Sequence, residues 1–195
     1  IAAGNNPTVS VHRRPRVAIL STGDEIVEPG APMHGNQIVS SNSITLTAMV
    51  EAAGAEAINL GIAQDNRESL AAAFRKGLEA DLLVTTGGAS VGEHDLVKPV
   101  LAEFGLELDF WKIAMRPGKP LIFGAVDGTG ILGLPGNPVS SYVCGLLFMI
   151  PAINAMMGIN DHELPLEPAI LGDDIPANDQ RLEFMRARTS RDKDG

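Results

Sequence analysis

Short aliphatic runs alternate along this chain with longer segments whose apolar residues recur every three or four positions. Runs of four to eight aliphatic residues predict strands, and the three-to-four spacing predicts amphipathic helices. Strands are expected at residues 16–20, 56–62, 82–86, 106–113, 121–125 and 130–134. Helices are expected at residues 42–53, 67–79, 96–104 and 137–156. This alternation is typical of βαβ units with parallel strands, so the pattern predicts a doubly wound, three-layer αβα domain.

Residues that start or stop elements support the same boundaries. Ser41 or Asn42 can cap the first helix, Gly54 can close it, and Asn66 can cap the second helix. The turn at 126–130, which contains Asp-Gly, predicts a β-hairpin, and Pro151 is expected to kink the last helix.

The polar, Gly- and Pro-containing residues 1–14 are expected to form a linker, and residues 15–158 the α/β domain. Residues 159–195 are expected to begin a β-rich domain, with β-type runs at 169–171 and 182–187. The chain begins without methionine and stops in a charged run, so we expect a fragment of a longer protein.

Composition narrows the class of partner. The 195 residues carry 45% hydrophobic residues, 4% aromatic residues and a net charge of −9, which argues against binding of nucleic acid. The single cysteine, Cys144, excludes an internal disulfide and indicates a reducing compartment, so a cytoplasmic location is expected. No membrane association is expected, because the most apolar segment, 143–153, is short and contains Pro151.

Acidic turns follow three of the expected strands, and ligands of doubly wound sheets bind beyond such strand ends. The turns carry Asp24 and Glu25, then Asp65, then Asp95 after the glycine pair Gly87-Gly88. Glycines let backbone N–H groups approach an anion, and carboxylates hold Mg²⁺, so a magnesium and phosphate site is one interpretation. The alternative is that each acid caps the following helix, and this is favoured for Asp65 taken alone.

Two further segments could bind an anion. Lys112, Arg116 and Lys119 lie in a stretch stiffened by two prolines, although they could also form a solvated basic loop. The Pro135–Pro138 turn leads into the last helix, whose N-terminal N–H groups could face a ligand, while proline also simply starts helices well.

Five motifs in order resemble the molybdopterin molybdenumtransferases, the molybdenum insertases related to the gephyrin E domain. They are Ser21-Thr22-Gly23-Asp24-Glu25, Ser41-Asn42-Ser43, the run from Thr86 to Asp95, the run from Lys112 to Pro120, and Leu134-Pro135-Gly136-Asn137-Pro138. The resemblance implies a pterin-binding α/β domain followed by a β-barrel domain. It implies insertion of molybdate into adenylylated molybdopterin, with Mg²⁺-dependent release of AMP. The partners implied are a second copy of the chain and a molybdopterin adenylyltransferase.

The resemblance also assigns residues. Metal and catalytic acids are Glu25, Asp65 and Asp95, and the cations for molybdate or a terminal phosphate are Lys112, Arg116 and Lys119. Arg116 stands where lysine is expected in many relatives, which keeps the charge but changes its geometry. Residues expected to bind the pterin substrate are Thr22, Gly23, Asp24, Ser41, Asn42, Gly87, Gly88, Ser90, Gly92, Pro135, Gly136, Asn137 and Pro138.

Three alternatives remain open at this point. A molybdopterin adenylyltransferase shares the expected fold, but its glycine loop typically reads Thr-Gly-Gly-Thr-Gly. The competence-damage-inducible relatives would continue with Leu-Gly-Pro, which this chain lacks. The third alternative is a non-catalytic scaffold domain like that of gephyrin.

Overall fold

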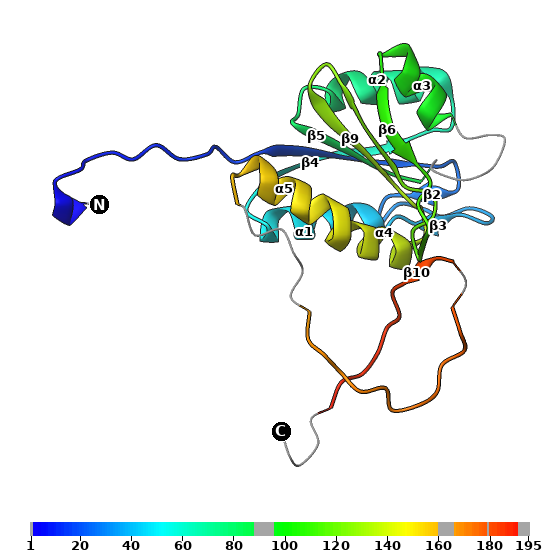
Figure 1. Ribbon diagram of the computed structural model, residues 1–195. Coiled ribbons are helices and arrows are strands. Elements are labelled where there is room, and N and C mark those ends of the chain that lie inside the picture. Colours follow the sequence, from blue (N-terminus) through cyan, green and yellow to red (C-terminus); the bar gives the residue numbers. More distant parts are fainter. Residues whose placement is uncertain (1, 88–95, 160–165, 179, 191–195) are drawn as a thin grey trace.

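A six-stranded mixed sheet forms the centre of the computed structural model, which describes residues 2–87, 96–159, 166–178 and 180–190 (Figure 1). Its strand order is β4-β1-β5-β9-β8-β6. The strands are β1 (Arg16–Thr22), β4 (Glu56–Ala63), β5 (Leu82–Thr86), β6 (Glu107–Trp111), β8 (Ile122–Val126) and β9 (Thr129–Leu134). The first four in spatial order, β4, β1, β5 and β9, are parallel, whereas β8 is antiparallel to both β9 and β6.

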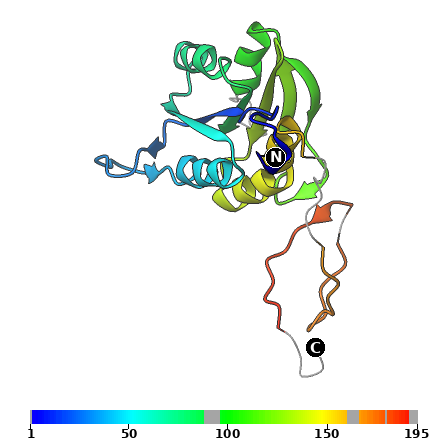
Figure 2. The ribbon, with the colours of Figure 1, turned by 90° about the vertical axis from the view of Figure 1, so that its left-hand side faces the viewer.

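Helices cover both faces of this sheet, as Figures 1 and 2 show. On one face lie α1 (Asn42–Ala52), α4 (Pro138–Cys144) and α5 (Ile150–Met156). On the other lie α2 (Arg67–Gly77) and α3 (Val97–Glu103). The three-layer αβα class with a mostly parallel sheet is therefore confirmed.

Alternate residues of the central strands enter two separate cores. In β1, Val17 and Ile19 pack under α1 and α5, whereas Ala18 and Leu20 pack under α2 and α3. Because side chains alternate between the faces of a sheet, a strand that is covered on both faces must be apolar throughout. This requirement explains the unbroken aliphatic runs of the sequence.

Most expected elements are confirmed, with ends that shift by one to a few residues. Asn66 caps α2 by accepting a hydrogen bond from the Ser69 N–H at 2.9 Å, whereas Ser41 makes no side-chain cap. Asp127 and Gly128, both at positive φ, form the two-residue turn of the β8–β9 hairpin.

In the part of the chain that the structure describes, four short strands lie outside the main sheet. Between β1 and α1, β2 (Ile26–Val27) pairs with β3 (Ile38–Val39). In the tail, β10 (Leu182–Glu183) pairs with β7 (Met115–Arg116), and the rest of the described tail extends away from the layers (Figure 2). The expectation of a strand at 169–171 was wrong, because those residues are exposed and form no strand with any described segment.

The last helix is continuous but irregular. A π-helical segment, η2 (Gly145–Met149), joins α4 to α5, so the departure from α geometry comes before Pro151. Proline lacks the N–H that would bond to the carbonyl four residues earlier, which accounts for a disturbed turn at this point.

Among the described residues, one helix, Pro138–Met156, is long and apolar enough to cross a membrane by length and composition. The expectation that this segment is too short was wrong, because the helix begins five residues before 143. Length therefore does not exclude a span; Cys144, Met149 and Ile153 of this helix are buried in the core, and 28% of its apolar window is buried.

Candidate functional site

The carboxyl ends of the parallel strands meet at one edge of the sheet. Thr22 at the end of β1 pairs in register with Ala63 of β4, and Thr86 at the end of β5 pairs with Leu134 of β9. The antiparallel strand β8 begins at this same edge, where Ile122 lies opposite Trp111, the last residue of β6. The sheet therefore brings the acidic turns, the glycine loop and the basic stretch to a single edge.

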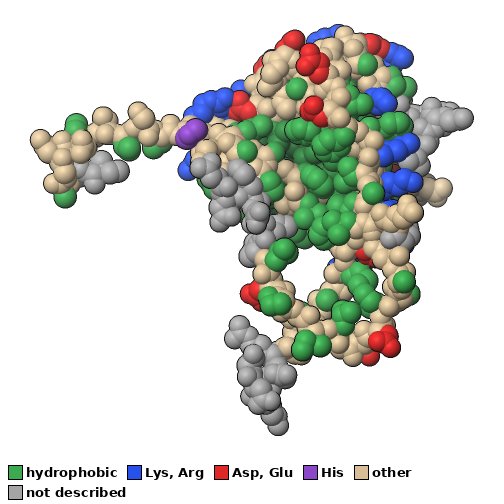
Figure 3. Space-filling model, in the orientation of Figure 1, with side chains coloured by type: hydrophobic (Ala, Val, Ile, Leu, Met, Phe, Trp, Pro, Cys, Tyr) green, Lys and Arg blue, Asp and Glu red, His purple; other side chains and the backbone are tan. Residues whose placement is uncertain are grey.

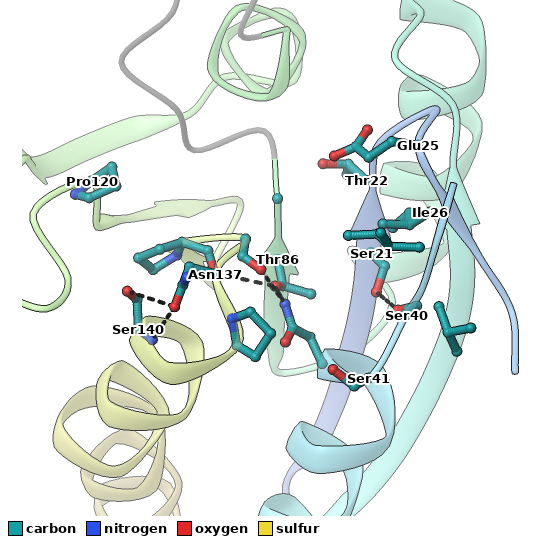
Figure 4. Close-up of a pocket in the computed structure, with 17 residues that line it drawn as sticks. Ser21, Thr22, Glu25, Ile26, Ser40, Ser41, Thr86, Pro120, Asn137 and Ser140 are labelled. Atoms are coloured by element: carbon teal, nitrogen blue, oxygen red, sulfur yellow. Dashed lines mark hydrogen bonds between the residues drawn. The ribbon is translucent and has the colours of Figure 1, made fainter. Parts of the chain in front are cut away.

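A cavity of about 600 Å³ opens at this edge, between β1, the start of α1 and the turn before α4 (Figure 4). Figure 4 shows Thr22 and Glu25 on the β1 side, Asn137 and Ser140 at the start of α4, and Thr86 between them. Its described lining residues are Ser21, Thr22, Glu25, Ile26, Ile38, Val39, Ser40, Ser41, Asn42, Thr86, Gly87, Pro120, Pro135, Gly136, Asn137, Pro138 and Ser140. We call it the first cavity.

Two glycines let three backbone segments meet at the base of the first cavity. A Cβ on Gly87 would lie 2.3 Å from the backbone oxygen of Thr22, and Gly87 has a φ of +89°. A Cβ on Gly136 would lie 3.3 Å from the Cα of Gly87. The glycine at 87 is thus required by close contact with this chain's own β1, in addition to any contact with a ligand.

Asn42 connects the same segments through its side chain. Its Nδ2 donates to the Oγ1 of Thr86 and to the carbonyl of Gly136, both at 2.8 Å. With both amide protons committed, Asn42 holds the start of α1 against β5 and the turn before α4. Only its Oδ1 remains to accept a hydrogen bond from a ligand.

The hydroxyl of Thr22 is buried at the wall of the first cavity and has no hydrogen-bond partner among the described residues. Thr22 is only 3% exposed. A buried hydroxyl without a partner is unfavourable, and a ligand in the cavity could supply the missing bond. The neighbouring hydroxyl of Ser21 differs, because it lies 3.3 Å from the hydroxyl of Ser40.

The acidic residues divide between two cavities. Glu25 lines the first, whereas Gly23, Asp24 and Asp65 line a second cavity of about 500 Å³ on the other side of the β1–β2 turn. Asp24 accepts a hydrogen bond from the Asp65 N–H at 3.0 Å. Partial burial raises the pKa of the Asp65 carboxyl, and the negative charges of Asp24 and Glu25 raise it further. Within the described ranges, no group of three potential ligand side chains is close enough to hold a metal ion.

The helix N-terminus at the first cavity does not offer free N–H groups as expected. Asn137 Oδ1 accepts hydrogen bonds from the N–H groups of Val139 and Ser140, at 3.1 and 3.2 Å, and Pro138 has no N–H. Asn137 is therefore a helix cap, and its carbonyl also accepts from Ser141. Anion binding by these amides is excluded unless the cap opens.

The basic stretch closes on itself beside the first cavity. Its two ends are joined by hydrogen bonds from Lys112 N–H to the Leu121 carbonyl and from Ile113 N–H to the Lys119 carbonyl, both 3.0 Å. Arg116 forms a bidentate pair with Glu183 of the tail, with both N···O distances 3.0 Å. Arg116 is thus neutralised within the chain, whereas Lys112 and Lys119 make no ion pair with a described residue.

Cys144 anchors the basic stretch to α4. A Cβ on Gly118 would lie 2.6 Å from the Cys144 sulfur and 2.4 Å from the Cε of Met115. Burial raises the pKa of the Cys144 thiol to about 12, so the thiol packs as an apolar group and is not poised to act as a nucleophile.

The structure brings nine of the expected site residues together at the first cavity: Thr22, Glu25, Ser41, Asn42, Gly87, Pro135, Gly136, Asn137 and Pro138. The basic residues Lys112, Arg116 and Lys119 are not in its described lining. The residues expected at Gly88, Ser90, Gly92 and Asp95 lie outside the described part of the chain.

Sequence reasoning missed eight lining residues. They are Ser21, Ile26, Ile38, Val39, Ser40, Thr86, Pro120 and Ser140. Ile38 and Val39 could have been predicted, because they form an apolar pair inside a polar, Gly-rich segment. An apolar pair that is not buried in a core indicates a binding surface.

Comparison with known proteins places this geometry in a family. Residues 18–155 match the family described as "Probable molybdopterin binding domain". The molybdopterin molybdenumtransferase of Haemophilus influenzae is 39% identical over 180 residues, and that of Nostoc sp. is 42% identical over 163 residues. These alignments cover 91% and 82% of this chain but only 44% and 37% of the relatives, so the chain spans less than half of their length.

Solved structures agree with the sequence comparison. The crystal structure of the molybdopterin biosynthesis moeA protein from Pyrococcus horikoshii superimposes with a TM-score of 0.69 at 37% identity. The superposition covers 75% of this chain and 36% of that one. The matched family range contains the first cavity and both acidic turns that the structure describes. This chain belongs to the "Probable molybdopterin binding domain" family.

Proposed function

We propose that this chain forms the pterin-binding part of a molybdenum insertase, which inserts molybdate into adenylylated molybdopterin with Mg²⁺-dependent release of AMP. The observation that carries the proposal is the buried Thr22 hydroxyl at the wall of the first cavity, which has no hydrogen-bond partner among the described residues. A bound ligand could form the hydrogen bond that this hydroxyl lacks, and the family match supports a pterin as that ligand.

The walls of the first cavity suit a flat heterocycle. Ile26, Ile38 and Val39 offer apolar contact on one side, and Pro135 and Pro138 do so on the other. A few convergent polar groups among apolar walls are typical of sites that orient a small molecule. The Thr22 hydroxyl and the free Oδ1 of Asn42 would then orient the pterin.

The acidic residues fit Mg²⁺ in its usual mode. Magnesium is commonly held by one or two carboxylates, with waters and substrate phosphates completing its coordination. Glu25 and Asp65 would supply carboxylates here, and Asp95 a third. Burial is the largest cause of the raised pKa of Asp65, and the negative charges of Asp24 and Glu25 raise that pKa further. These neighbouring charges support the role, because crowded carboxylates gain from a cation. Bound Mg²⁺ would neutralise the pyrophosphate and favour departure of AMP.

The basic stretch would hold the oxyanion. Lys112 and Lys119 are exposed and carry no ion pair with a described carboxylate, so they can meet molybdate or a terminal phosphate. Arg116 would contribute only if it left Glu183, and we assign it a role in holding the tail against β7.

Thr22→Val tests the proposal, because valine keeps the shape of threonine and removes the hydroxyl. The folded chain should lose no stability, since no internal hydrogen bond is broken, but it should bind molybdopterin about tenfold more weakly. The matched control is Thr85→Val, because Thr85 also buries a hydroxyl that has no partner in the described part of the chain, and it is not in the described lining of the first cavity. Equal pterin affinity for both variants, measured by anaerobic titration calorimetry, would contradict the proposal.

Turnover is tested on the full-length protein with adenylylated molybdopterin, Mg²⁺ and molybdate. AMP release above background is expected, and Asp95→Asn should weaken this Mg²⁺-dependent release. Absence of AMP release would refute the enzymatic proposal, whereas the proposal of pterin binding would still be decided by the Thr22→Val titration.

The remaining assignments belong to the same proposal. A homodimer is supported by exposed apolar side chains on the adjacent helices α1 and α4, such as Ile44 and Tyr142. Figure 3 shows hydrophobic side chains gathered on the face that carries α4 and α5. An adenylyltransferase partner and a β-barrel that begins at 159–195 follow from the resemblance. A cytoplasmic location follows from the single cysteine, and the division into a linker at 1–14 and a domain at 15–158 follows from the composition of these segments.

A further inference from the structure

Two lysines share one indole ring at the outer end of the sheet. Lys98 of α3 places its Nζ 3.9 Å from the ring centroid of Trp111, and Lys112 places its Nζ 3.7 Å from the same centroid. The two ammonium groups are therefore no farther apart than the sum of these distances. Ammonium groups are attracted to an indole face, which fixes both charges although Trp111 is 38% exposed.

The backbone of Lys112 is held in an unusual conformation beside this ring. Its φ is +65°, in the left-handed region that residues with a Cβ rarely adopt. The hydrogen bond from Lys112 N–H to the Leu121 carbonyl, at 3.0 Å, holds it there. Strained backbone of this kind concentrates at functional sites, and here it accompanies a fixed cation.

The charges of this cluster are not neutralised within the described chain. Each of its ion pairs joins an arginine to a carboxylate, and none involves a lysine. The chain carries a net charge of −9, yet neither ammonium group forms an ion pair with a described carboxylate. Like charges held close together repel each other, and a bound anion would relieve that repulsion.

The cluster lies at the same edge as the first cavity but is separate from it. Trp111 ends β6 and faces Ile122, which follows Pro120 of the cavity wall by two residues. Lys98 lies in the first turn of α3, the helix that follows the glycine loop. Neither lysine is in the described lining of the first cavity.

We propose that Lys98 and Trp111 extend the anion site already assigned to Lys112 into a phosphate-binding subsite, in which the indole holds two ammonium groups beside one multiply charged anion. The inference deepens the proposed function, which supplies the role of Lys112 and the source of that anion, the phosphates of the adenylylated pterin. A phosphate or pyrophosphate group accepts hydrogen bonds from both ammonium groups at once, which a single carboxylate does less well.

Trp111 is the only tryptophan, so its fluorescence reports on this subsite without a label. Pyrophosphate is the probe, titrated into the chain at constant ionic strength. We expect a saturable change in emission, and about tenfold weaker binding in Lys98→Gln and in Lys112→Gln, from the loss of one charged hydrogen bond. Lys76→Gln is the matched control, because Lys76 is an exposed lysine at the far end of α2. Affinities are taken from the concentration dependence, so an altered starting emission does not disturb the comparison.

The inference is overturned if wild-type emission does not saturate, if sodium chloride alone reproduces the change, or if the double variant Lys98→Gln/Lys112→Gln binds as tightly as the wild type. Thr22→Val separates this outcome from the proposed function. That variant should keep its affinity for pyrophosphate while losing affinity for the pterin, so either proposal can fail without the other.

Discussion

Replacing Gly87 with alanine tests how closely the strands approach beneath the first cavity. The new Cβ would lie 2.3 Å from the backbone oxygen of Thr22, and the backbone at 87 has a φ of +89°. The left-handed conformation costs an L-residue 1–2 kcal/mol, and forced overpacking costs 1–3 kcal/mol, so a loss of about 2–5 kcal/mol in the free energy of unfolding is expected. In a chain of this length each kcal/mol lowers the melting temperature by about 2–4 °C.

Gly105→Ala separates the two contributions. Gly105 has a φ of +85°, and nothing lies within 4 Å of a Cβ built there, so this variant carries the conformational strain without the steric clash. Urea unfolding followed by Trp111 fluorescence should place Gly87→Ala well below Gly105→Ala in stability. If the two variants unfold at the same urea concentration with equal slopes, the close approach of Gly87 to Thr22 is refuted.

Three further predictions concern side chains at or near the site. Asp65→Asn should raise the melting temperature of the Mg²⁺-free chain, because asparagine cannot ionise in this partly buried, acidic position. The increase should grow as the pH rises through the raised pKa of the Asp65 carboxyl, since the wild type loses its favoured protonated form over that pH range. A lower melting temperature at every pH would contradict this. Asn42→Asp cannot donate to Thr86 or to Gly136, so urea unfolding should show a loss of about 1–3 kcal/mol, and wild-type stability would refute the clamp. Cys144, with its pKa raised to about 12, should resist a thiol reagent at pH 8 until urea unfolds the chain, and fast labelling of the folded chain would show that the thiol is accessible.

The sheet and its helices were predictable because their signals are local. A strand covered on both faces requires every side chain to be apolar, and Val17 to Leu20 meet that requirement in four consecutive letters. The position of the site was predictable for a related reason. Once parallel strands are assigned, their carboxyl ends must share an edge, so Thr22, Gly87 and the turn before α4 had to meet.

Two features of the site could not be predicted from the sequence. One depends on a partner that is distant along the chain, and the other depends on which group binds a single side-chain oxygen. Arg116 reads as a free cation, but Glu183, 67 residues away in the sequence, neutralises it. The turn before α4 reads as an anion site, but Asn137 can serve either a ligand or its own helix, and the structure has it cap the helix. Such choices are decided by the three-dimensional geometry and by no local pattern.

The strand order also separates charge along the edge. Asp24 and Asp65 follow β1 and β4, at one side of the sheet, whereas Lys112 follows β6 at the opposite side. The first cavity lies between them, at the ends of β1, β5 and β9. On the proposed function, a ligand there would lie between the carboxylates on one side and the ammonium groups on the other. Since β6 runs parallel to β4, β1, β5 and β9, and β8 runs antiparallel to them, the connection from β6 to β8 lies at this edge, and that connection is the basic stretch. If β8 ran parallel to β6, a crossover to the other end of the sheet would replace this short connection, and the lysines would not be held beside the cavity.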